Sequence, residues 1–476
     1  MHIVTVGMTP ALVCDLWNRI QAKGGHRISH IAHPSHDRKS WAAIAPVTDA
    51  LFFRNDLREE MPSPDREFLA SLEGTGVPTI HNMILSDRFV SRLPYDQALG
   101  YATLLAKKLL EFYGALKPTA VIGGFDSLHG SLGFAVARLM RIPWFVLNFS
   151  SLPSGQVALC SDLSPASKVM LEPRRMETMR STADRVLKEF ENRKLEAAAY
   201  IPPKILSAGY IIRRIPSQAR SLLKIARRRS LKSALKYSEN PAAYSIAGLF
   251  RESIRLRKNV FRLPSNELIC EPPGVPYAFF GMHMQPESSI DVFAHFYSNQ
   301  VHVIELIARS LPPSHILLVK LHKSDVPNYS RATLGRIARL PGVRLVSPYA
   351  DTIEFIRRSA LVMSIQGTIG LEGALLGKPV IMFGDSPTKR FPNVSTIGRD
   401  PDLPVLVRQK IGEKPPARAA IVDAFAAYLS TFYPASRNDW TIRPTDEEIG
   451  GYVHLLALLE GYLQSGEDAL KRQERS

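Results

Sequence analysis

The stretch of sequence that most constrains the fold runs from Ala360 to Gly384. Ala360–Ile365 is a short apolar run that contains Val and Ile, as in a buried parallel strand. After Gln366-Gly367-Thr368, the segment Ile369–Leu376 places its apolar residues at helical spacing and ends at a glycine, a common helix C-terminus. Val380–Phe383 is a second apolar run. The pattern predicts a strand-turn-helix-strand unit, the repeating piece of a parallel α/β sheet.

The turn of this unit also predicts a binding site. Open α/β sheets bind ligands beyond the carboxyl ends of their strands, where a helix N-terminus offers N–H groups and about half a positive charge to a phosphate. Gly367 permits close approach of the backbone, Thr368 adds a hydroxyl, and Gln366 adds an amide. Glu372 lies one turn into the helix, where it can accept bonds from sugar hydroxyls. Alternatively, Gly367 and Thr368 only form the turn and Glu372 is solvated.

Length and charge narrow the class of protein. A chain of 476 residues is too long for one ordinary core, which predicts two domains. The net charge of +16 favours an anionic partner, such as nucleic acid, an anionic membrane or a phosphorylated or acidic substrate, and charge alone does not choose among them. We expect no membrane span and no signal peptide, because the required apolar runs are missing. The three cysteines are far apart, which indicates a reduced, cytosolic protein.

Residues 1–165 alternate short apolar runs with helical patterns, which predicts an N-terminal Rossmann-like domain. The predicted strands are His2–Val6, Ile28–Ala32, Ala50–Phe53, Thr79–His81, Ala120–Gly123 and Trp144–Asn148. The predicted helices lie near Pro10–Ala22, Pro64–Leu72, Tyr95–Leu116 and Ser127–Met140.

Residues 166–271 have no strand pattern and predict a helical, basic insertion, with a long charged helix in Arg174–Ala199 and a strongly basic segment in Ile211–Lys236. A basic amphipathic helix often lies on an anionic membrane surface, where each Lys or Arg contributes about 1 kcal/mol. The alternative is a solvated basic face. Nucleic acid is less favoured, because aromatic residues for base stacking are missing. The residues predicted to bind the membrane are Arg213, Arg214, Arg220, Lys224, Arg227, Arg228, Arg229 and Lys232.

Residues 272–415 predict a second Rossmann-like domain, which contains the unit described first. Its earlier strands are predicted at Tyr277–Met282, Ile316–Leu321 and Val343–Val346, and its earlier helices at Asn299–Ser310, Ser330–Leu340 and Thr352–Arg358. Residues 416–476 predict C-terminal helices near Ala417–Phe432 and Asp446–Gln464, followed by a charged, frayed end.

Polar residues directly follow three of these apolar strands, in the segments Gly281–Ser289, Lys320–Lys323 and Gln366–Thr368. Because the carboxyl ends of parallel strands meet at one edge, we expect these groups to converge. Taken singly, a histidine here is more often a bonded loop residue than a ligand contact. No His/Cys/Asp cluster has metal spacing, so no metal is predicted. No P-loop and no G-x-G-x-x-G follows a strand, which argues against ATPases and dehydrogenases.

The order of these motifs resembles the capsule polysaccharide biosynthesis family, which includes bacterial Kdo transferases. The resemblance covers about Pro276 to Asp385 and is carried by FFGMHMQPESS, LLVKLHK, PGVRLVSP and SIQGTIGLEGALLGKPVIMFG. It implies a GT-B architecture, in which two Rossmann-like domains face a cleft and the C-terminal one binds a nucleotide sugar. In the Kdo-transferring members that donor is CMP-Kdo. No cofactor is implied besides this co-substrate.

The resemblance also implies roles for single residues. Lys320 and His322 match the family's Lys-x-His-Pro motif near the donor phosphate, although Lys323 stands where proline is usual, which leaves the donor's identity open. Glu372 matches the helix carboxylate placed for the ribose. The donor-binding residues implied in this way are His283, Gln285, Glu287, Lys320, His322, Gln366, Gly367, Thr368 and Glu372.

A glycosyl transfer also needs a base near the acceptor hydroxyl. The candidate is Asp126, which follows the predicted strand Ala120–Gly123 and opens a helix; His129 is a second candidate. The alternative for Asp126 is an N-cap.

These observations predict a glycosyltransferase that moves a sugar to a lipid-linked or growing surface polysaccharide such as a capsule. The basic segment would hold it peripherally at the inner membrane, on the cytoplasmic side. Two alternatives stay open: a nucleotide-sugar 2-epimerase of the same fold, and a non-catalytic polysaccharide assembly or export factor. The predicted phosphate turn argues against the latter. Nucleic-acid binding would rest on charge alone, and we expect none.

Overall fold

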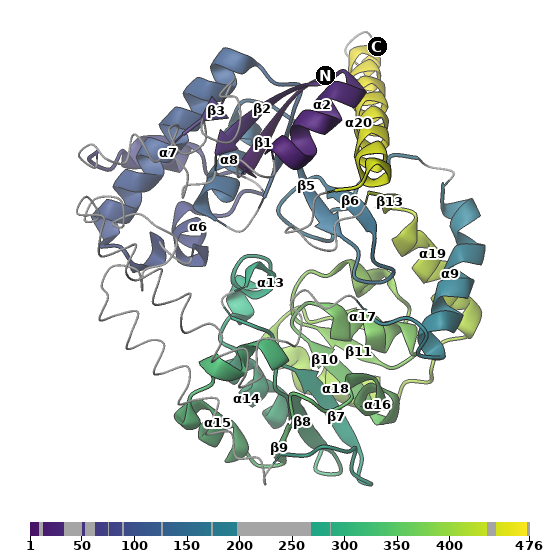
Figure 1. Cartoon of the computed structure of the whole chain (residues 1–476). Helices are drawn as coiled ribbons and strands as arrows, with labels where there is room; N and C mark the ends of the chain where they lie inside the picture. Colours follow the sequence, from purple (N-terminus) through teal and green to yellow (C-terminus); the bar gives the residue numbers. More distant parts are fainter. Residues whose placement is uncertain are drawn as a thin grey trace, which may run out of the picture. The chain divides into compact units, whose positions relative to one another are not determined.

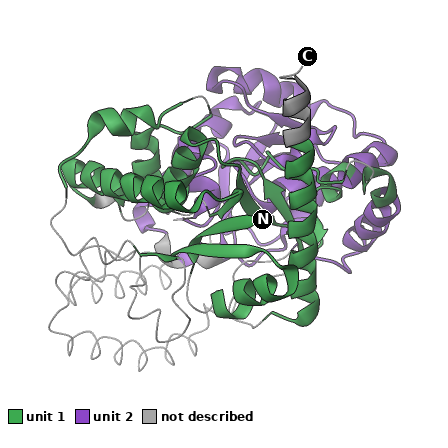
Figure 2. Ribbon diagram, turned by 90° about the horizontal axis from the view of Figure 1, so that it is seen from above, with its two compact units in different colours: residues 1–179, 237–239, 427–476 green, residues 180–236, 240–426 purple. Residues whose placement is uncertain are grey.

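The computed structural model describes residues 1–8, 13–32, 50–52, 62–74, 76–87, 90–124, 127–172, 175–197, 268–285, 287–435 and 444–473. These residues form two compact units (Figure 2): unit 1 takes the described residues from 1 to 179 and from 427 to 473, and unit 2 takes the described residues from 180 to 426. The C-terminal segment expected as a separate block of helices from residue 416 is thus divided between the two units. The eight predicted membrane-binding residues lie outside the described residues.

Unit 1 is built on a seven-stranded sheet with the order β3-β2-β1-β4-β5-β6-β13 (Figure 1). Among these strands β6 is antiparallel to both of its neighbours, and the other pairs are parallel. The strands are β1 (His2–Met8), β2 (Arg27–Ala32), β3 (Ala50–Leu51), β4 (Ala120–Gly123), β5 (Trp144–Phe149), β6 (Gln156–Cys160) and β13 (Tyr433–Pro434). The helices are η1 (Val13–Trp17), α2 (Asn18–Gly24), α5 (Arg66–Ser71), α6 (Ile80–Ser86), η2 (Val90–Arg92), α7 (Tyr95–Leu116), α8 (Leu128–Leu139) and α20 (Asp446–Gln473).

Alternate residues of β1 pack on opposite faces of this sheet. Ile3 belongs to one hydrophobic cluster with Trp17 of η1 and Tyr452 of α20. Its neighbour Val4 belongs to another cluster with Leu105 of α7. Successive residues of a strand point to opposite sides, so the uninterrupted apolar run of β1 reflects burial on both faces. Unit 1 is therefore a doubly wound sheet, as predicted.

The strand predicted over Thr79–His81 is wrong, because the helix α6 begins there. Thr79 is its N-cap, and the Thr79 hydroxyl accepts a hydrogen bond from the Asn82 N–H at 3.2 Å. The local pattern of threonine and isoleucine favours a strand, but this cap satisfies a helix donor. Strands β6, β12 and β13 and helix α18 have no counterpart among the predicted elements.

Unit 2 is built on a six-stranded parallel sheet with the order β9-β8-β7-β10-β11-β12. Its strands are β7 (Tyr277–Gly281), β8 (Ile316–Lys320), β9 (Val343–Val346), β10 (Leu361–Ser364), β11 (Val380–Met382) and β12 (Val394–Thr396). Its helices are α13 (Ser288–Asp291), η6 (His295–Tyr297), α14 (Gln300–Ser310), η7 (Lys323–Asn328), α15 (Arg331–Ala338), α16 (Thr352–Arg358), α17 (Thr368–Leu375), η8 (Pro387–Arg390), η9 (Asp400–Asp402) and α18 (Leu403–Ile411). Two further helices, α9 (Arg175–Glu191) and α19 (Arg418–Leu429), span the points where the chain passes between the units.

The strand order of unit 2 is the Rossmann order, in which the winding reverses between the first and fourth strands, here β7 and β10. Phe280 of β7 packs in one cluster with Ile304 of α14 and Val407 of α18. On the other face, Phe279 stacks on Phe355 of α16, with ring centroids 5.7 Å apart. The predicted α/β fold with two Rossmann-like units is confirmed.

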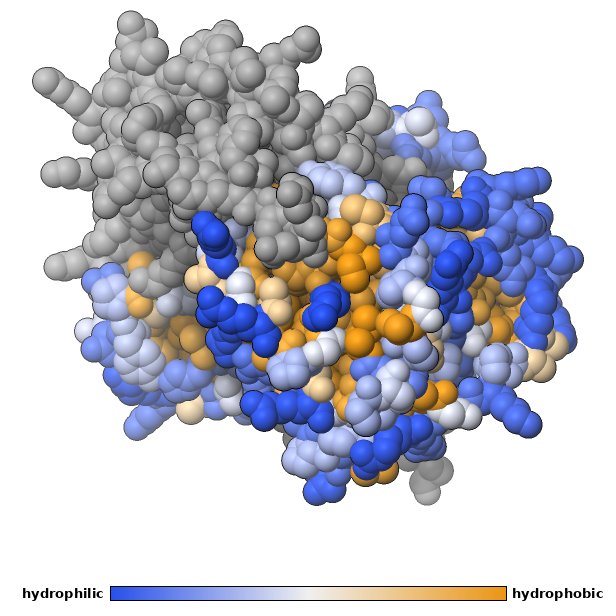
Figure 3. Space-filling model, turned by 90° about the horizontal axis from the view of Figure 1, so that it is seen from below, coloured by the Kyte–Doolittle hydropathy of each residue, from blue (hydrophilic) through white to orange (hydrophobic). Residues whose placement is uncertain are grey.

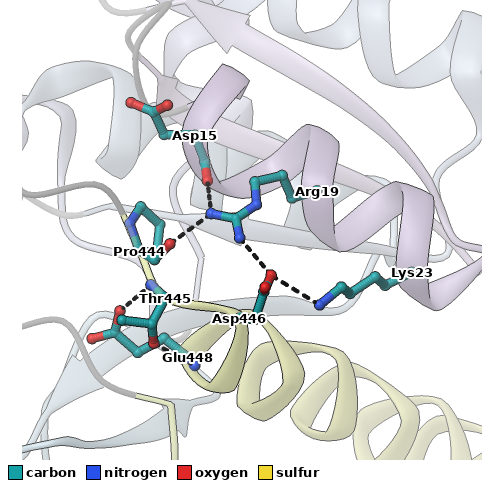
Figure 4. A network of polar contacts seen from close by, with 7 residues as sticks. All are labelled: Asp15, Arg19, Lys23, Pro444, Thr445, Asp446 and Glu448. Atoms are coloured by element: carbon teal, nitrogen blue, oxygen red, sulfur yellow. Dashed lines mark hydrogen bonds and ion pairs between the residues drawn. The ribbon is translucent and has the colours of Figure 1, made fainter.

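Helix α20 is fixed to helix α2 within unit 1 by a network of polar contacts at its N-terminus (Figure 4). Arg19 donates to the Pro444 carbonyl at 2.6 Å and to the Asp446 carboxylate at 2.7 Å. Thr445 and Glu448 form a capping box, in which each accepts a bond from the other's backbone N–H. The charged end expected to fray is helical as far as Gln473.

No helix among the described residues is long and apolar enough to cross a membrane. On the face of the molecule in Figure 3, a patch of hydrophobic residues lies among hydrophilic ones. Apolar atoms contribute more than half of the surface of an ordinary folded protein, so this patch alone indicates no partner.

Two adjacent glycines of α20 should respond in opposite ways to alanine. A Cβ at Gly451 would lie 2.1 Å from the Pro434 carbonyl oxygen of β13, whereas a Cβ at Gly450 would meet nothing within 4 Å. Gly451→Ala should destabilise unit 1 by about 1–3 kcal/mol through overpacking. Gly450→Ala should stabilise it by up to about 1 kcal/mol through helix propensity. Thermal unfolding of the two variants measures this, and equal shifts would contradict the docking of α20 on β13.

Candidate functional site

A cavity of about 580 Å³ lies in unit 2 beside the carboxyl ends of its strands. It is lined by residues that follow β7, β8, β9 and β10 and by the end of α9. Because β7 and β10 flank the point where the winding reverses, the cavity occupies the place where open α/β sheets bind their ligands. Among the donor-binding residues expected from the sequence, those that line the cavity are His283, Glu287, Lys320, His322, Gln366, Gly367, Thr368 and Glu372.

Hydrogen bonds join the ends of β7 and β10 across this point. His283 Nε2 lies 2.5 Å from the Gln366 carbonyl oxygen and 3.2 Å from the Gln366 backbone nitrogen. The Ser364 hydroxyl donates to the same carbonyl at 2.5 Å. The next residue, Gly367, has a φ of 86°, which favours glycine, and it is the N-cap of α17. The loop is therefore fixed in the shape that directs the start of α17 at the cavity.

The side chain of Gln300 holds His283 from behind. Its Oε1 accepts from the His283 N–H at 2.8 Å, and its Nε2 donates to the His283 carbonyl at 3.0 Å and to Gln285 Oε1 at 2.8 Å. Gln285 in turn donates to Asp291 and does not line the cavity. The sequence analysis gave Gln300 no role, since a glutamine in the first turn of a helix is ordinarily exposed.

The side-chain amide of Gln366, which the sequence predicted to face a ligand, is bonded within the protein. Its Nε2 donates to the Asp385 carbonyl at 2.8 Å, and the residue is 4% exposed. The backbone of Gln366 is bonded to His283, so both parts of the residue are occupied within the protein. The structure therefore offers the backbone of the following turn, and the Thr368 hydroxyl, as the groups of this segment that are directed to a ligand.

Burial shifts the pKa of three ionisable groups in the cavity wall. It lowers the pKa of His283 to about 4, so this ring is neutral at pH 7. It raises the pKa of Glu372 to about 7, against the attraction of Lys320. It lowers the pKa of Lys320 to about 8, and the Lys320 ammonium donates to the Pro348 carbonyl at 3.0 Å. Burial and the charges of Lys320 and Lys323 also lower the pKa of His322.

Three buried polar atoms in the wall have no hydrogen-bond partner among the described residues: Glu372 Oε2, Ser289 Oγ and His283 Nδ1. Buried polar groups are nearly always bonded, and leaving one unsatisfied costs about 1–3 kcal/mol. Three such atoms around one cavity indicate a site for a polar ligand. The alternative of a solvated Glu372 is wrong, because this residue is 8% exposed.

One wall of the cavity comes from a segment that the sequence analysis placed in the helical insertion. Four residues after α9 line the cavity together with Tyr349 and Asp351; they are Arg193, Leu195, Glu196 and Ala197. Arg193 forms an ion pair with Asp351 at 2.5 Å. No sequence pattern links these residues, because they are more than 150 positions apart and meet only in the folded chain.

The candidates for the catalytic base belong to the other half of the sequence. Asp126 lies outside the described residues. His129 lies on α8 in the core of unit 1, where its Nε2 is 3.1 Å from the Tyr101 hydroxyl. The N-cap position of α8 is Ser127, and the Leu128 N–H donates to Asp87 at 2.7 Å. The catalytic roles of Asp126 and His129 stay predictions.

Gln300→Leu should destabilise the chain by about 1–3 kcal/mol, because the leucine leaves the His283 N–H and carbonyl unsatisfied in a buried place. Gln409→Leu, an exposed position on α18, is the matched control and should change stability by no more than about 0.5 kcal/mol. Urea denaturation measures both. Equal stability of the two variants would show that Gln300 does not hold the strand end.

No protein-family model matches the chain, and no curated protein is similar to it. Among solved structures, the chain is similar to KpsC of Thermosulfurimonas dismutans, a beta Kdo 2,4 transferase, at 14% identity and a TM-score of 0.33, over 64% of this chain and 79% of that one. It is similar to the UDP-GlcNAc 2-epimerase of Methanocaldococcus jannaschii in complex with UDP-GlcNAc and UDP, at 10% identity and a TM-score of 0.29, over 90% and 99% of the two chains. It is also similar to the alpha,alpha-trehalose 6-phosphate synthase of Burkholderia multivorans, at 12% identity and a TM-score of 0.35, over 100% and 98%.

Proposed function

We propose that the cavity of unit 2 binds a nucleotide sugar and that the chain is a glycosyltransferase. The observation that carries this proposal is the set of unsatisfied buried atoms, Glu372 Oε2, Ser289 Oγ and His283 Nδ1, beside the start of α17. This helix begins at the point where the winding of the sheet reverses. The combination suits a ligand that has both an anionic group and hydroxyl groups, as a nucleotide sugar does.

The phosphate of the donor would lie at the N-terminus of α17. There, the first N–H groups of the helix and the Thr368 hydroxyl can donate to phosphate oxygens, and Gly367 keeps the approach open. Lys320 and His322 line the same cavity and supply positive charge or N–H donors. One turn into the helix, the Glu372 carboxylate can accept hydrogen bonds from the ribose hydroxyls.

The same groups would promote the transfer. The bond between the sugar and the phosphate breaks more easily when donors stabilise the negative charge that develops on the leaving phosphate. The start of α17 can do so without moving, because the contact between His283 and Gln366 holds the ends of β7 and β10 together. Lys320 and His322 are held in place separately, since Lys320 donates to the Pro348 carbonyl and the His322 N–H donates to the Tyr329 hydroxyl. Asp126 and His129 stay predictions as bases for the acceptor's hydroxyl proton.

In this proposal the donor is CMP-Kdo and the acceptor is a lipid-linked or growing surface polysaccharide, as the sequence resemblance implies. The binding of the basic segment to an anionic inner-membrane surface, and with it the peripheral cytoplasmic location, stays a prediction. That segment lies outside the described residues.

Calorimetry with CMP, UDP, GDP and ADP tests the site. We expect CMP to bind selectively and His322→Ala to weaken its binding about tenfold, which corresponds to about 1.4 kcal/mol for a lost hydrogen bond to a charged group. His302→Ala, an exposed histidine of α14 that does not line the cavity, should leave the affinity unchanged. Binding of none of the four nucleotides would contradict the proposed function. Epimerisation of a free nucleotide sugar without an acceptor would replace the transferase by an epimerase.

The affinity for the nucleotide should depend on pH. Below pH about 7 Glu372 becomes protonated and is a poorer acceptor for the ribose; above pH about 8 Lys320 loses the proton that attracts the phosphate. Affinity should therefore be highest between these values, with a proton released on binding at the acidic side. Glu372→Gln keeps the shape of the side chain but does not titrate. It should therefore remove the part of the affinity loss below pH about 7 that comes from protonation of Glu372. The ligand's own phosphate titrates in the same way with the wild-type chain and with the variant. The difference between their calorimetric pH profiles therefore reports on Glu372 alone. Identical profiles would exclude a role of Glu372 in binding the ribose.

A further inference from the structure

The cavity has a second end whose chemistry differs from that of the phosphate turn. The end of α9, the segment after it and the loop and helix after β9 line this end, and they contribute aromatic and aliphatic residues beside charged ones. The aromatic and aliphatic residues are Phe190, Leu195, Ala197, Tyr349, Ala350 and Ile353. In the sheet, three strand spacings separate β9 from β10, which is about 14 Å at the usual distance between strands. A single phosphate cannot reach both ends.

Tyr349 presents a large aromatic side chain to this end. The residue is 59% exposed and lines the cavity. The loop that carries it is well fixed, since the Lys320 ammonium donates to the Pro348 carbonyl at 3.0 Å and the Ala350 N–H donates to the Ser347 carbonyl at 3.1 Å. An exposed ring on a fixed loop is arranged to stack on a planar group.

The segment after α9 is held against the same loop within unit 2. Arg193 pairs with Asp351, which also caps α16, and Arg357 of α16 donates to the Glu191 carbonyl at 2.5 Å. These contacts place Glu196 in the cavity wall, near enough to Glu372 for its charge to raise the pKa of that carboxyl. The wall of the second end therefore combines an aromatic face with an exposed carboxylate.

We propose that this second end binds the base of the nucleotide, that Tyr349 stacks on the base, and that Glu196 selects a base that carries an amino group, such as cytosine. The inference rests on the proposed function. Stacking on an aromatic side chain accepts any base, because every base has a π face. A carboxylate discriminates, because it accepts a hydrogen bond from the amino group of cytosine, whereas the corresponding oxygen of uracil has no proton to donate.

Calorimetric titration with three ligands separates the parts of the cavity: CMP, UMP, and ribose 5-phosphate, which has no base. The wild-type chain should bind CMP more tightly than UMP. Tyr349→Ala should weaken CMP about tenfold and leave ribose 5-phosphate unchanged. Tyr462→Ala, at an exposed tyrosine of α20, is the matched control and should change neither. Glu196→Gln should reduce the preference for CMP over UMP about three- to tenfold, since a carboxamide can pair with either base.

Each other outcome overturns a defined part of the proposal. If Tyr349→Ala weakens ribose 5-phosphate as much as CMP, or leaves CMP unchanged, the second end does not bind the base. If Glu196→Gln keeps the ratio of CMP to UMP affinity, Glu196 does not select it. If the wild-type chain binds CMP, the proposed function stands in both cases. If it binds none of the three ligands, the proposed function fails and this inference fails with it.

Discussion

The hydrogen bonds between His283 and Gln366 are the interaction on which the rest of the site depends. They join the two strand ends between which the winding of the sheet reverses. Depending on its tautomer, His283 Nε2 donates to the carbonyl or accepts from the N–H of Gln366, the residue before Gly367. Gln300 holds the His283 backbone from the other side. Without these contacts, two loops with several buried polar groups would have to find partners separately, at a cost of about 1–3 kcal/mol for each group left unsatisfied. The polar network therefore fixes one geometry for the start of α17.

A consequence of this arrangement is that the residues that are polar in the sequence divide into two sets. One set forms hydrogen bonds from its side-chain amides to other protein groups and so shapes the cavity; it consists of Gln285, Gln300 and Gln366. Glu372 and Ser289 keep buried oxygens unsatisfied. Residue type does not distinguish the sets, since an amide and a carboxylate are equally suited to a ligand. Only the positions of the partners decide which group is available.

The dependence on distant partners also limits which parts of the structure the sequence could predict. Helices α7 and α17 and the strands β7 to β11 of unit 2 were predictable because their signals are local: apolar periodicity, a glycine at the turn, and another at the helix end. The three-residue strand at Thr79 failed because so short a run has no periodicity, and the cap of α6 decided its structure. The wall formed by Arg193 and Glu196 could not be predicted, because it depends on an ion pair with Asp351 that links distant parts of the chain.

The net charge of the chain is positive, whereas the cavity wall carries charges of both signs. The formal charge of +16 suggested an anionic partner, yet the cavity wall contains Glu196, Glu287, Asp351 and Glu372 beside Arg193, Lys320 and Lys323. Attraction by net charge is long-ranged and is screened within about 8 Å at physiological salt. A nucleotide in a cavity of this mixed sign must instead be held by directed contacts at short range, where solvent and salt screen less. The excess positive charge therefore says little about the donor, and its explanation has to be sought at a surface other than this cavity.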